Sequence, residues 1–89
     1  MKILRYSTQY KKDFKRYKHR PEKLQTLLGV FRILENEKPL PKEFKAHKLK
    51  GQYYGCIECH IEDDILLIWL DEGSEFIYIL RLGTHSELF

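Results

Sequence analysis

The spacing of hydrophobic residues changes once, near Tyr53, and this change restricts the fold of the 89-residue chain more than any other feature. Before it, apolar residues recur every three to four positions, as on one face of a helix. After it, apolar and polar residues alternate, as in a strand with one buried face. A chain of this length builds one domain, and this order of elements predicts an α+β fold.

The first half predicts a strand followed by two helices. Residues 2–6 form the strand, and Ser7 or Thr8 is a suitable N-cap for the first helix. The apolar face of that helix consists of aromatic residues: Tyr10, Phe14 and Tyr17. Pro21 suits the first turn of the second helix. Its apolar stripe consists of residues at helical spacing: Leu24, Leu27, Leu28, Phe31 and Leu34.

The second half predicts an antiparallel meander. Pro39 to Pro41 end the second helix, and residues 42–52 resemble a loop. From Tyr53 the alternation places Ile57, Cys59 and Ile61 on one face and Cys56, Glu58, His60 and Glu62 on the other. A turn at 63–64, an apolar central strand at 65–70, a turn at 71–74 and a strand at 76–82 follow. The two-helix hairpin is expected to cover one face of the sheet and to leave the other partly open for a site.

Charge is distributed very unevenly along the chain. Residues 1–50 carry 15 of the 16 Lys and Arg and 5 of the 13 acidic residues, a net charge of +10, whereas residues 51–89 have a net charge of −7. This asymmetry indicates a polyanion such as nucleic acid as a partner, although the two halves could instead neutralise each other across the fold. The sequence shows no secretory signal and no membrane-spanning run, so we expect a cytoplasmic protein with free thiols and no membrane partner.

The string Cys56-Ile57-Glu58-Cys59-His60 has the form of a c-type haem attachment site. In a regular strand, however, cysteines three residues apart point to opposite faces. A closed zinc site would also need a second pair of ligands, and the chain has no other cysteine. We therefore expect no metal site and no cofactor, with Cys59 as a small buried residue.

Three histidines lie outside the predicted helices: His47, His60 and His85. With Asp64 they form a set of titratable side chains in the half of the chain that builds the sheet. RNA carries its own nucleophile, the 2′-hydroxyl, so its cleavage needs a base, an acid and cations but no metal. Histidine suits both proton transfers, and Arg81 and loop lysines suit the stabilisation of charge on the phosphate. The residues match the needs of a metal-independent ribonuclease, but by themselves they do not distinguish it from other functions.

Several strings give this set a more specific meaning: "YSTQYKKDFK" at 6–15, "PLPKEFKAHKLKG" at 39–51, "ECHIEDDILLIW" at 58–69 and "RLGTHSELF" at 81–89. Their order and spacing resemble the YafQ-like branch of the RelE/ParE superfamily of type II toxin–antitoxin toxins. The resemblance covers nearly the whole chain. It implies a microbial RNase-like α+β fold and a cytoplasmic mRNA interferase that cuts mRNA in the ribosomal A site. It also implies a ribosome partner and a cognate antitoxin.

The resemblance also implies site residues. The histidine of the family's D-H-x-L-x-G string falls on His47, the E-C-H string falls on Glu58 and His60, and the acid after the turn falls on Asp64. His85 lies in the L-G-[ST]-H string, and Phe89 is the terminal aromatic residue. We expect His85 to act as general acid, and His60 or Asp64 as base or as the group that orients it. The expected contacts to RNA and its phosphates come from five further residues: Arg81, Lys48, Lys50, Phe89 and Glu58.

The chain also departs from the family pattern. Ile57 stands where many relatives have arginine, Asp63 where they often have proline, and Ala46 where they have aspartate. The first two changes weaken attraction for phosphate, and they are compatible with a slower or inactive enzyme. Three alternatives therefore stay open: a ParE-like gyrase inhibitor, a non-catalytic RNA- or ribosome-binding module, and a bare antitoxin-binding domain.

Overall fold

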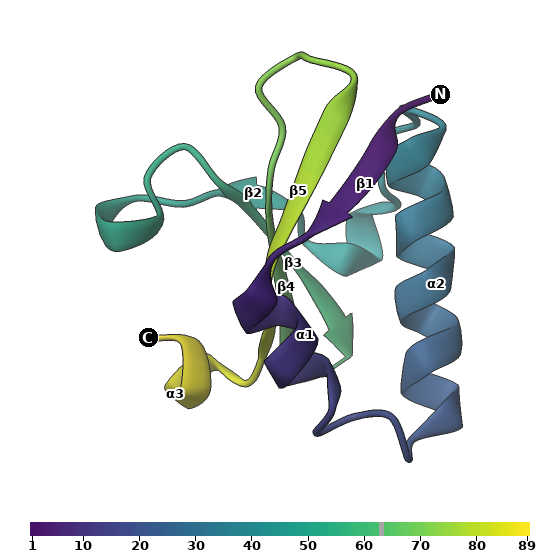
Figure 1. Ribbon diagram of the computed structural model, residues 1–89, viewed down its shortest axis with the longest axis vertical. Helices are drawn as coiled ribbons and strands as arrows, with labels where there is room; N and C mark the ends of the chain where they lie inside the picture. Colours follow the sequence, from purple (N-terminus) through teal and green to yellow (C-terminus); the bar gives the residue numbers. More distant parts are fainter. Residues whose placement is uncertain (63) are drawn as a thin grey trace.

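The protein is described by a computed structural model covering residues 1–62 and 64–89. A five-stranded mixed sheet forms its centre, with the strand order β1-β5-β4-β3-β2 (Figure 1). The strands are β1 (Ile3–Tyr6), β2 (His47–Lys48), β3 (Ile57–Glu62), β4 (Ile65–Leu70) and β5 (Phe76–Gly83). The helices are α1 (Thr8–Phe14), α2 (Pro21–Glu35) and α3 (His85–Leu88), with 3-10 turns η1 (Lys42–Phe44) and η2 (Gly51–Tyr53). The α+β prediction is confirmed.

The main core lies between the sheet and the helices α1 and α2. It joins the buried faces of both helices to one face of β3, β4 and β5, and it includes Leu27, Val30, Cys59, Leu67 and Ile79. Figure 1 shows α2 running along this side of the sheet. As predicted, the apolar strand β4 is covered on both faces, because a smaller cluster containing Leu66 and Ile68 packs on its other side.

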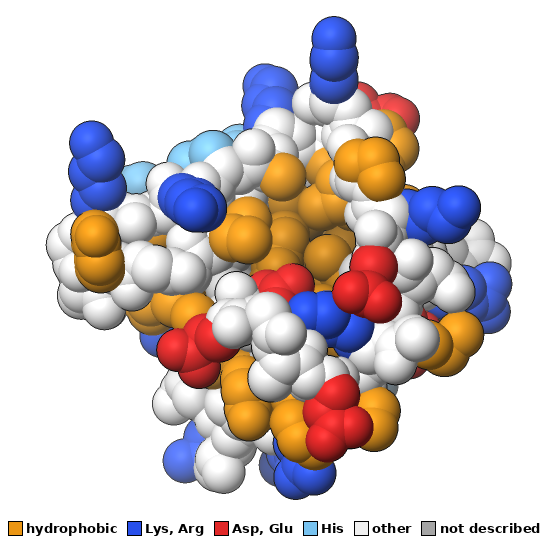
Figure 2. All heavy atoms as spheres, turned by 90° about the horizontal axis from the view of Figure 1, so that it is seen from above, with side chains coloured by type: hydrophobic (Ala, Val, Ile, Leu, Met, Phe, Trp, Pro, Cys, Tyr) orange, Lys and Arg blue, Asp and Glu red, His pale blue; other side chains and the backbone are white. Residues whose placement is uncertain are grey.

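The face of the sheet opposite α2, called the open face below, is covered only by short segments. These are the protruding loop between β2 and β3 and the short helix α3, both visible on the side away from α2 in Figure 1. Their contribution to the smaller cluster includes Leu49, Tyr53, Cys56 and Leu88. In Figure 2 hydrophobic side chains gather in a hollow at the centre of the view, with both acidic and basic side chains along its lower border. The expected partly open face is therefore present.

Four details of the predicted elements were wrong. Helix α1 ends at Phe14, one turn early, and Tyr17 is buried from the turn that follows. Leu28 is 54% exposed and lines an apolar groove with α1 rather than packing in the core. The predicted loop at 42–52 contains β2 and two 3-10 turns, so the next strand starts at Ile57 rather than Tyr53. The predicted tail contains α3, whose N-cap Thr84 forms a capping box with Glu87.

Candidate RNA-cleavage site on the open face

The register of the sheet places several of the predicted site residues in one line across the open face. His47 pairs with Glu58, Glu58 pairs with Ile68, and Ile68 pairs with Arg81. Neighbouring strands lie about 4.8 Å apart, so this line extends over roughly 14 Å. The adjacent line on the same face runs from His60 through Leu66 to Gly83. His47, Glu58, His60 and Arg81 therefore share one face, as the alternation predicted for Glu58 and His60.

One hydrogen bond anchors His47, and an acidic side chain lies beside its other ring nitrogen. Its Nε2 lies 3.4 Å from Oε1 of Glu58, and its Nδ1 lies 2.9 Å from the carbonyl oxygen of Lys45. Glu58 is buried, and its Oε2 has no hydrogen-bond partner among the described residues. A buried carboxylate in this position orients His47 and cannot attract a phosphate, so the expected contact of Glu58 with RNA is unsupported by its geometry. His47 remains half exposed and can reach a ligand.

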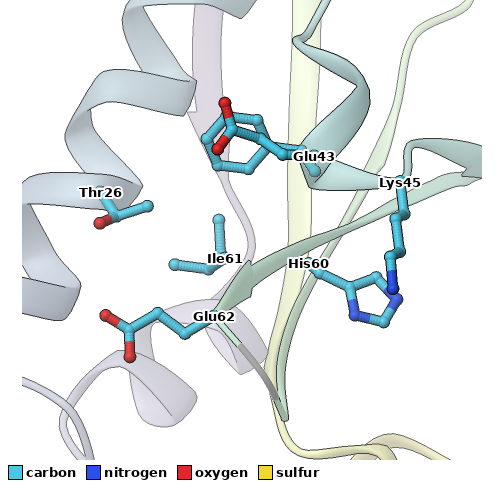
Figure 3. A pocket seen from close by; sticks show the side chains of 7 residues that line it. Thr26, Glu43, Lys45, His60, Ile61 and Glu62 are labelled. Atoms are coloured by element: carbon cyan, nitrogen blue, oxygen red, sulfur yellow. The ribbon is translucent and has the colours of Figure 1, made fainter.

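His60 lines a pocket of about 550 Å³ at the edge of β3 that is not covered by β2. Figure 3 shows Lys45 and His60 pointing to the same side of β3, with Glu43 and Thr26 across the pocket. Lys45 has a left-handed backbone conformation with φ of 52°, which is uncommon for a residue other than glycine. This conformation directs its carbonyl to His47 while its ammonium group lies in the pocket of His60.

The bulge in β3 changes the predicted alternation beyond His60. The pairing with β4 shifts between His60 and Glu62, because β3 has one more residue than its partner there. The Glu62 carboxylate lies 3.4 Å from Nζ of Lys23 on α2, away from the polar face on which it was expected. Asp64 is exposed in the turn, and its side chain forms no hydrogen bond or ion pair with the other candidate residues in the described part of the chain. Asp63, one of the departures from the family pattern, lies outside the described residues.

His85 belongs to a second group of side chains at the end of β5. Its ring stacks on Phe89, with centroids 4.9 Å apart, and Phe89 meets the edge of Tyr53 at 5.4 Å. The Tyr53 hydroxyl donates to the carbonyl of Leu88 and accepts from Nη1 of Arg81 at 3.1 Å. Phe89 therefore supports the His85 imidazole. In the described part of the chain no hydrogen bond engages the ring nitrogens of His85, so they are accessible to a ligand.

Glu87 fixes the helix that carries His85. Its Oε1 accepts from the backbone N–H of Thr84 at 2.7 Å and from the hydroxyl of Tyr17 at 3.0 Å. These hydrogen bonds lower the pKa of Glu87 below its usual value, and the bond from the backbone N–H of Thr84 has the largest effect. A Cβ at Gly83 would lie 2.9 Å from Oε1 of Glu87, so a larger residue there would require the Glu87 side chain to shift. The position of His85 thus depends on contacts with the turn that follows α1.

Arg81, expected to bind phosphate, is itself tied to a buried acid. Its Nε and Nη2 donate to the two carboxylate oxygens of Asp13, at 2.8 and 3.3 Å. Burial raises the pKa of Asp13, but hydrogen bonds from Arg81, Leu82 N–H and Gln9 outweigh it and lower the pKa overall. The same contact raises the pKa of Arg81. The guanidinium is therefore a fixed cation, with only part of its donor capacity left for a ligand.

The cysteines lie in different clusters, which confirms their predicted separation. Cys59 is fully buried in the main core, whereas Cys56 packs on the open face. Burial, with a smaller effect of Glu58, raises the pKa of Cys59 to about 12. Residues 1–62 and 64–89 contain no group of three or more His, Cys, Asp or Glu side chains placed to hold a metal ion.

Sequence reasoning missed three residues that build the site: Asp13, Lys45 and Tyr53. Asp13 is the sole acid among the lysines and arginines of residues 11–20, which was an available signal for a buried ion pair. Tyr53 lies beside Tyr54 in a glycine-flanked loop, and nothing in its spacing identifies it as the inward-facing one. The roles of all three depend on contacts with distant segments.

Solved structures show the same fold over the whole chain. A copper-bound variant of a toxin from Helicobacter pylori has 35% identity and a TM-score of 0.91, covering 100% of both chains. YafQ in the DinJ–YafQ complex of Escherichia coli has 31% identity and a TM-score of 0.87, covering 100% of this chain and 99% of YafQ. The fold thus corresponds to that of small bacterial toxins.

The sequence comparisons agree. The family described as "Bacterial toxin of type II toxin-antitoxin system, YafQ" matches residues 2–89. The mRNA interferase toxin YafQ of Escherichia coli K12 is 34% identical over 87 residues, which cover 97% of this chain and 94% of that protein. The chain belongs to the YafQ family of type II toxin–antitoxin toxins. No helix within the described ranges is long and apolar enough to cross a membrane.

Proposed function

We propose that this toxin is an mRNA endoribonuclease that cuts messages in the ribosomal A site and is restrained by a cognate antitoxin. The observation that carries the proposal is the placement of His47, His60 and Arg81 on one open face, with an accessible His85 where β5 ends. The E. coli relative is named an mRNA interferase, which supports the same activity here.

The proposed reaction uses the substrate's own nucleophile. A base takes the proton of the 2′-hydroxyl, its oxygen forms a bond to phosphorus, and the P–O5′ bond breaks. The leaving 5′-oxygen receives a proton from an acid, so the products carry a 2′,3′-cyclic phosphate and a 5′-hydroxyl. Each proton transfer contributes about 10²- to 10⁴-fold to the rate.

We assign the acid to His85, whose exposed ring is fixed by Phe89. The base is His60, or Asp64 acting with it, since His60 faces the same side of the sheet and lines a pocket. His47, oriented by Glu58, and Lys45 supply donors and positive charge to the phosphate. Arg81 contributes a fixed positive charge at the far end of the line, while Lys48 and Lys50 remain expected phosphate contacts.

The test is cleavage of a defined mRNA by the purified chain, with and without translating ribosomes. The chain offers a matched control, because His19 is an exposed histidine outside the open face. We expect His85→Ala to reduce cleavage by at least about 100-fold, and His19→Gln to leave it unchanged. Mapping of the cut ends checks for the cyclic phosphate. Absence of cleavage by the wild-type chain in all conditions would refute the proposal and favour gyrase inhibition or antitoxin binding alone.

The antitoxin is proposed from the relatives and from charge. The DinJ–YafQ structures contain a toxin of this family in complex with its partner. An acidic or amphipathic segment that folds on binding would complement the +10 charge of residues 1–50. Co-expression with the neighbouring reading frame should yield a stable complex that no longer cuts RNA; a complex with full activity would contradict inhibition by this partner.

A further inference from the structure

The loop between β2 and β3 projects from the open face (Figure 1). The N–H of Leu49 donates to the carbonyl of Cys56 at 2.9 Å and closes the loop. Within the loop, the N–H of Tyr54 donates to the carbonyl oxygen of Gly51, and the N–H of Cys56 donates to the carbonyl oxygen of Tyr53. Gly51 and Gly55 have φ of 72° and 89°, which glycine adopts without strain. The loop backbone is therefore fixed without help from a ligand.

The two tyrosines of this loop lie in contrasting environments. Tyr53 points inward, where its hydroxyl contacts Arg81 and Leu88. Tyr54 is 83% exposed, and its side chain makes no hydrogen bond or aromatic contact with any described residue. Packing of the fold therefore explains Tyr53 but gives no reason for a large exposed ring at Tyr54.

Positive charge surrounds the exposed ring. Lys48 and Lys50 are exposed, and together with Leu49, Tyr54 and Gly55 they line a recess of about 280 Å³. Neither lysine forms an ion pair with a described residue. In Figure 2 the left side of the molecule carries a protruding hydrophobic side chain with Lys or Arg side chains beside it. An exposed aromatic ring that shares a recess with lysines is an arrangement that binds single-stranded nucleic acid.

We infer that this loop is a second RNA contact, in which an unpaired base stacks on Tyr54 and the flanking phosphates pair with Lys48 and Lys50. The inference rests on the proposed function, since it takes RNA as the ligand. Lys48 follows His47 in the edge strand β2 and points to the other face of that strand, so RNA bound at His47 would reach Lys48 and the loop by passing over the edge of the sheet. The nucleotide belongs to the message or to ribosomal RNA, and both present the same chemistry. An acidic peptide would pair with the lysines but would not require an exposed ring.

The test measures binding of the wild-type chain and its variants to a single-stranded RNA made non-cleavable by 2′-O-methyl groups, and separately to ribosomes without message. We expect Tyr54→Ala to weaken binding in at least one of these arms by roughly 5- to 150-fold, which corresponds to about 1–3 kcal/mol per stacked base. Tyr54→Trp should retain the wild-type affinity, because tryptophan also offers an aromatic face for stacking. Tyr78, a partly exposed tyrosine on β5, provides the control, and Tyr78→Ala should have no effect.

The salt dependence tests the lysines. Lys48→Gln and Lys50→Gln should each reduce the slope of log affinity against log salt by about 0.7, the value for one phosphate of a single strand. An effect of Tyr54→Ala on free RNA assigns the nucleotide to the message, and an effect only on ribosomes assigns it to ribosomal RNA. Unchanged affinity in both arms, or an acidic peptide as the only ligand, overturns the inference.

The two proposals fail separately. If Tyr54→Ala leaves RNA and ribosome binding unchanged while the chain still cleaves RNA in a His85-dependent way, only the second RNA contact is overturned. Binding that depends on Tyr54, in a chain that never cleaves RNA, overturns the ribonuclease alone.

Discussion

Replacement of Asp13 by alanine tests whether the buried ion pair with Arg81 holds α1 to the end of β5. Asp13 is fully buried and accepts hydrogen bonds from Nε and Nη2 of Arg81, from Leu82 N–H and from Gln9. Without it, Nε and Nη2 of Arg81 and the buried N–H of Leu82 lose their acceptor, and only Nη1 keeps one, the Tyr53 hydroxyl. Removal of one partner of such a pair lowers the free energy of unfolding by about 3–5 kcal/mol. That is a large share of the about 5–15 kcal/mol typical of a whole domain.

The assay is urea denaturation followed by the fluorescence of Trp69, the only tryptophan, which is 3% exposed in the core. Glu62→Ala is the control, because it removes an ion pair with Lys23 whose side chains are partly exposed. We expect this control to lose less than about 1 kcal/mol. The double variant Asp13→Ala/Arg81→Met should recover part of the loss, since no charge is then stranded.

The reasoning is refuted if the free energy of unfolding of Asp13→Ala lies within about 1 kcal/mol of that of the control. It is also refuted if the double variant loses the sum of the free energies lost by Asp13→Ala and Arg81→Met separately. Acid titration gives an independent check. The pKa of Asp13 is lowered from 3.8, so its contribution is complete above that value and is lost as the pH falls through the lower folded value. Asp13→Asn should therefore flatten this part of the stability curve.

Three further outcomes are expected. Asparagine at position 45 tolerates the left-handed backbone conformation but lacks the cation that lies beside His60. The Lys45→Asn variant should therefore cleave RNA about 10-fold more slowly. Unchanged cleavage with an unchanged melting temperature would contradict a role of Lys45 in the pocket. Burial raises the pKa of Cys59 to about 12, so its thiol should react with a thiol reagent at pH 8 only after denaturation, and rapid labelling of the native chain would show that the strand opens. Burial and the Glu87 contact raise the pKa of Tyr17 from 10.0 to about 12, so its stabilisation is complete below pH 10 and lost as the pH rises through about 12; alkaline unfolding of Tyr17→Phe should lack this component.

The local periods of the sequence predicted most of the fold. The alternation after Tyr53 placed Cys59 and Glu58 on opposite faces, and the uniform apolar run at 65–70 identified the central strand. These predictions succeeded because burial of one face imposes a period of two on a strand. The end of α1 could not be predicted in this way, because Tyr17 is buried outside the helix and still fits the helical spacing.

The candidate site was predicted as a set of residue types rather than as an arrangement. The strings around His47, His60 and His85 identified the histidines, but their relation depends on pairing register across four strands. The bulge after His60 turns Glu62 toward α2, and the ion pair with Asp13 reduces the donors that Arg81 can offer. Both effects join residues far apart in the chain, which local patterns do not report.

The parallel pairing of β1 with β5 also affects when the toxin becomes active. The strand made first can complete the sheet only after the strand made last has formed, and Ser7 bonds to Leu80 across 73 positions. Contacts between residues so far apart in the chain form late and slowly, because the entropy of a long loop is lost before the contact contributes stabilising energy. Arg81 and His85 lie in or after β5, so an incompletely folded chain lacks an assembled site. A newly made chain would thus pass through an interval in which the candidate site is not yet assembled.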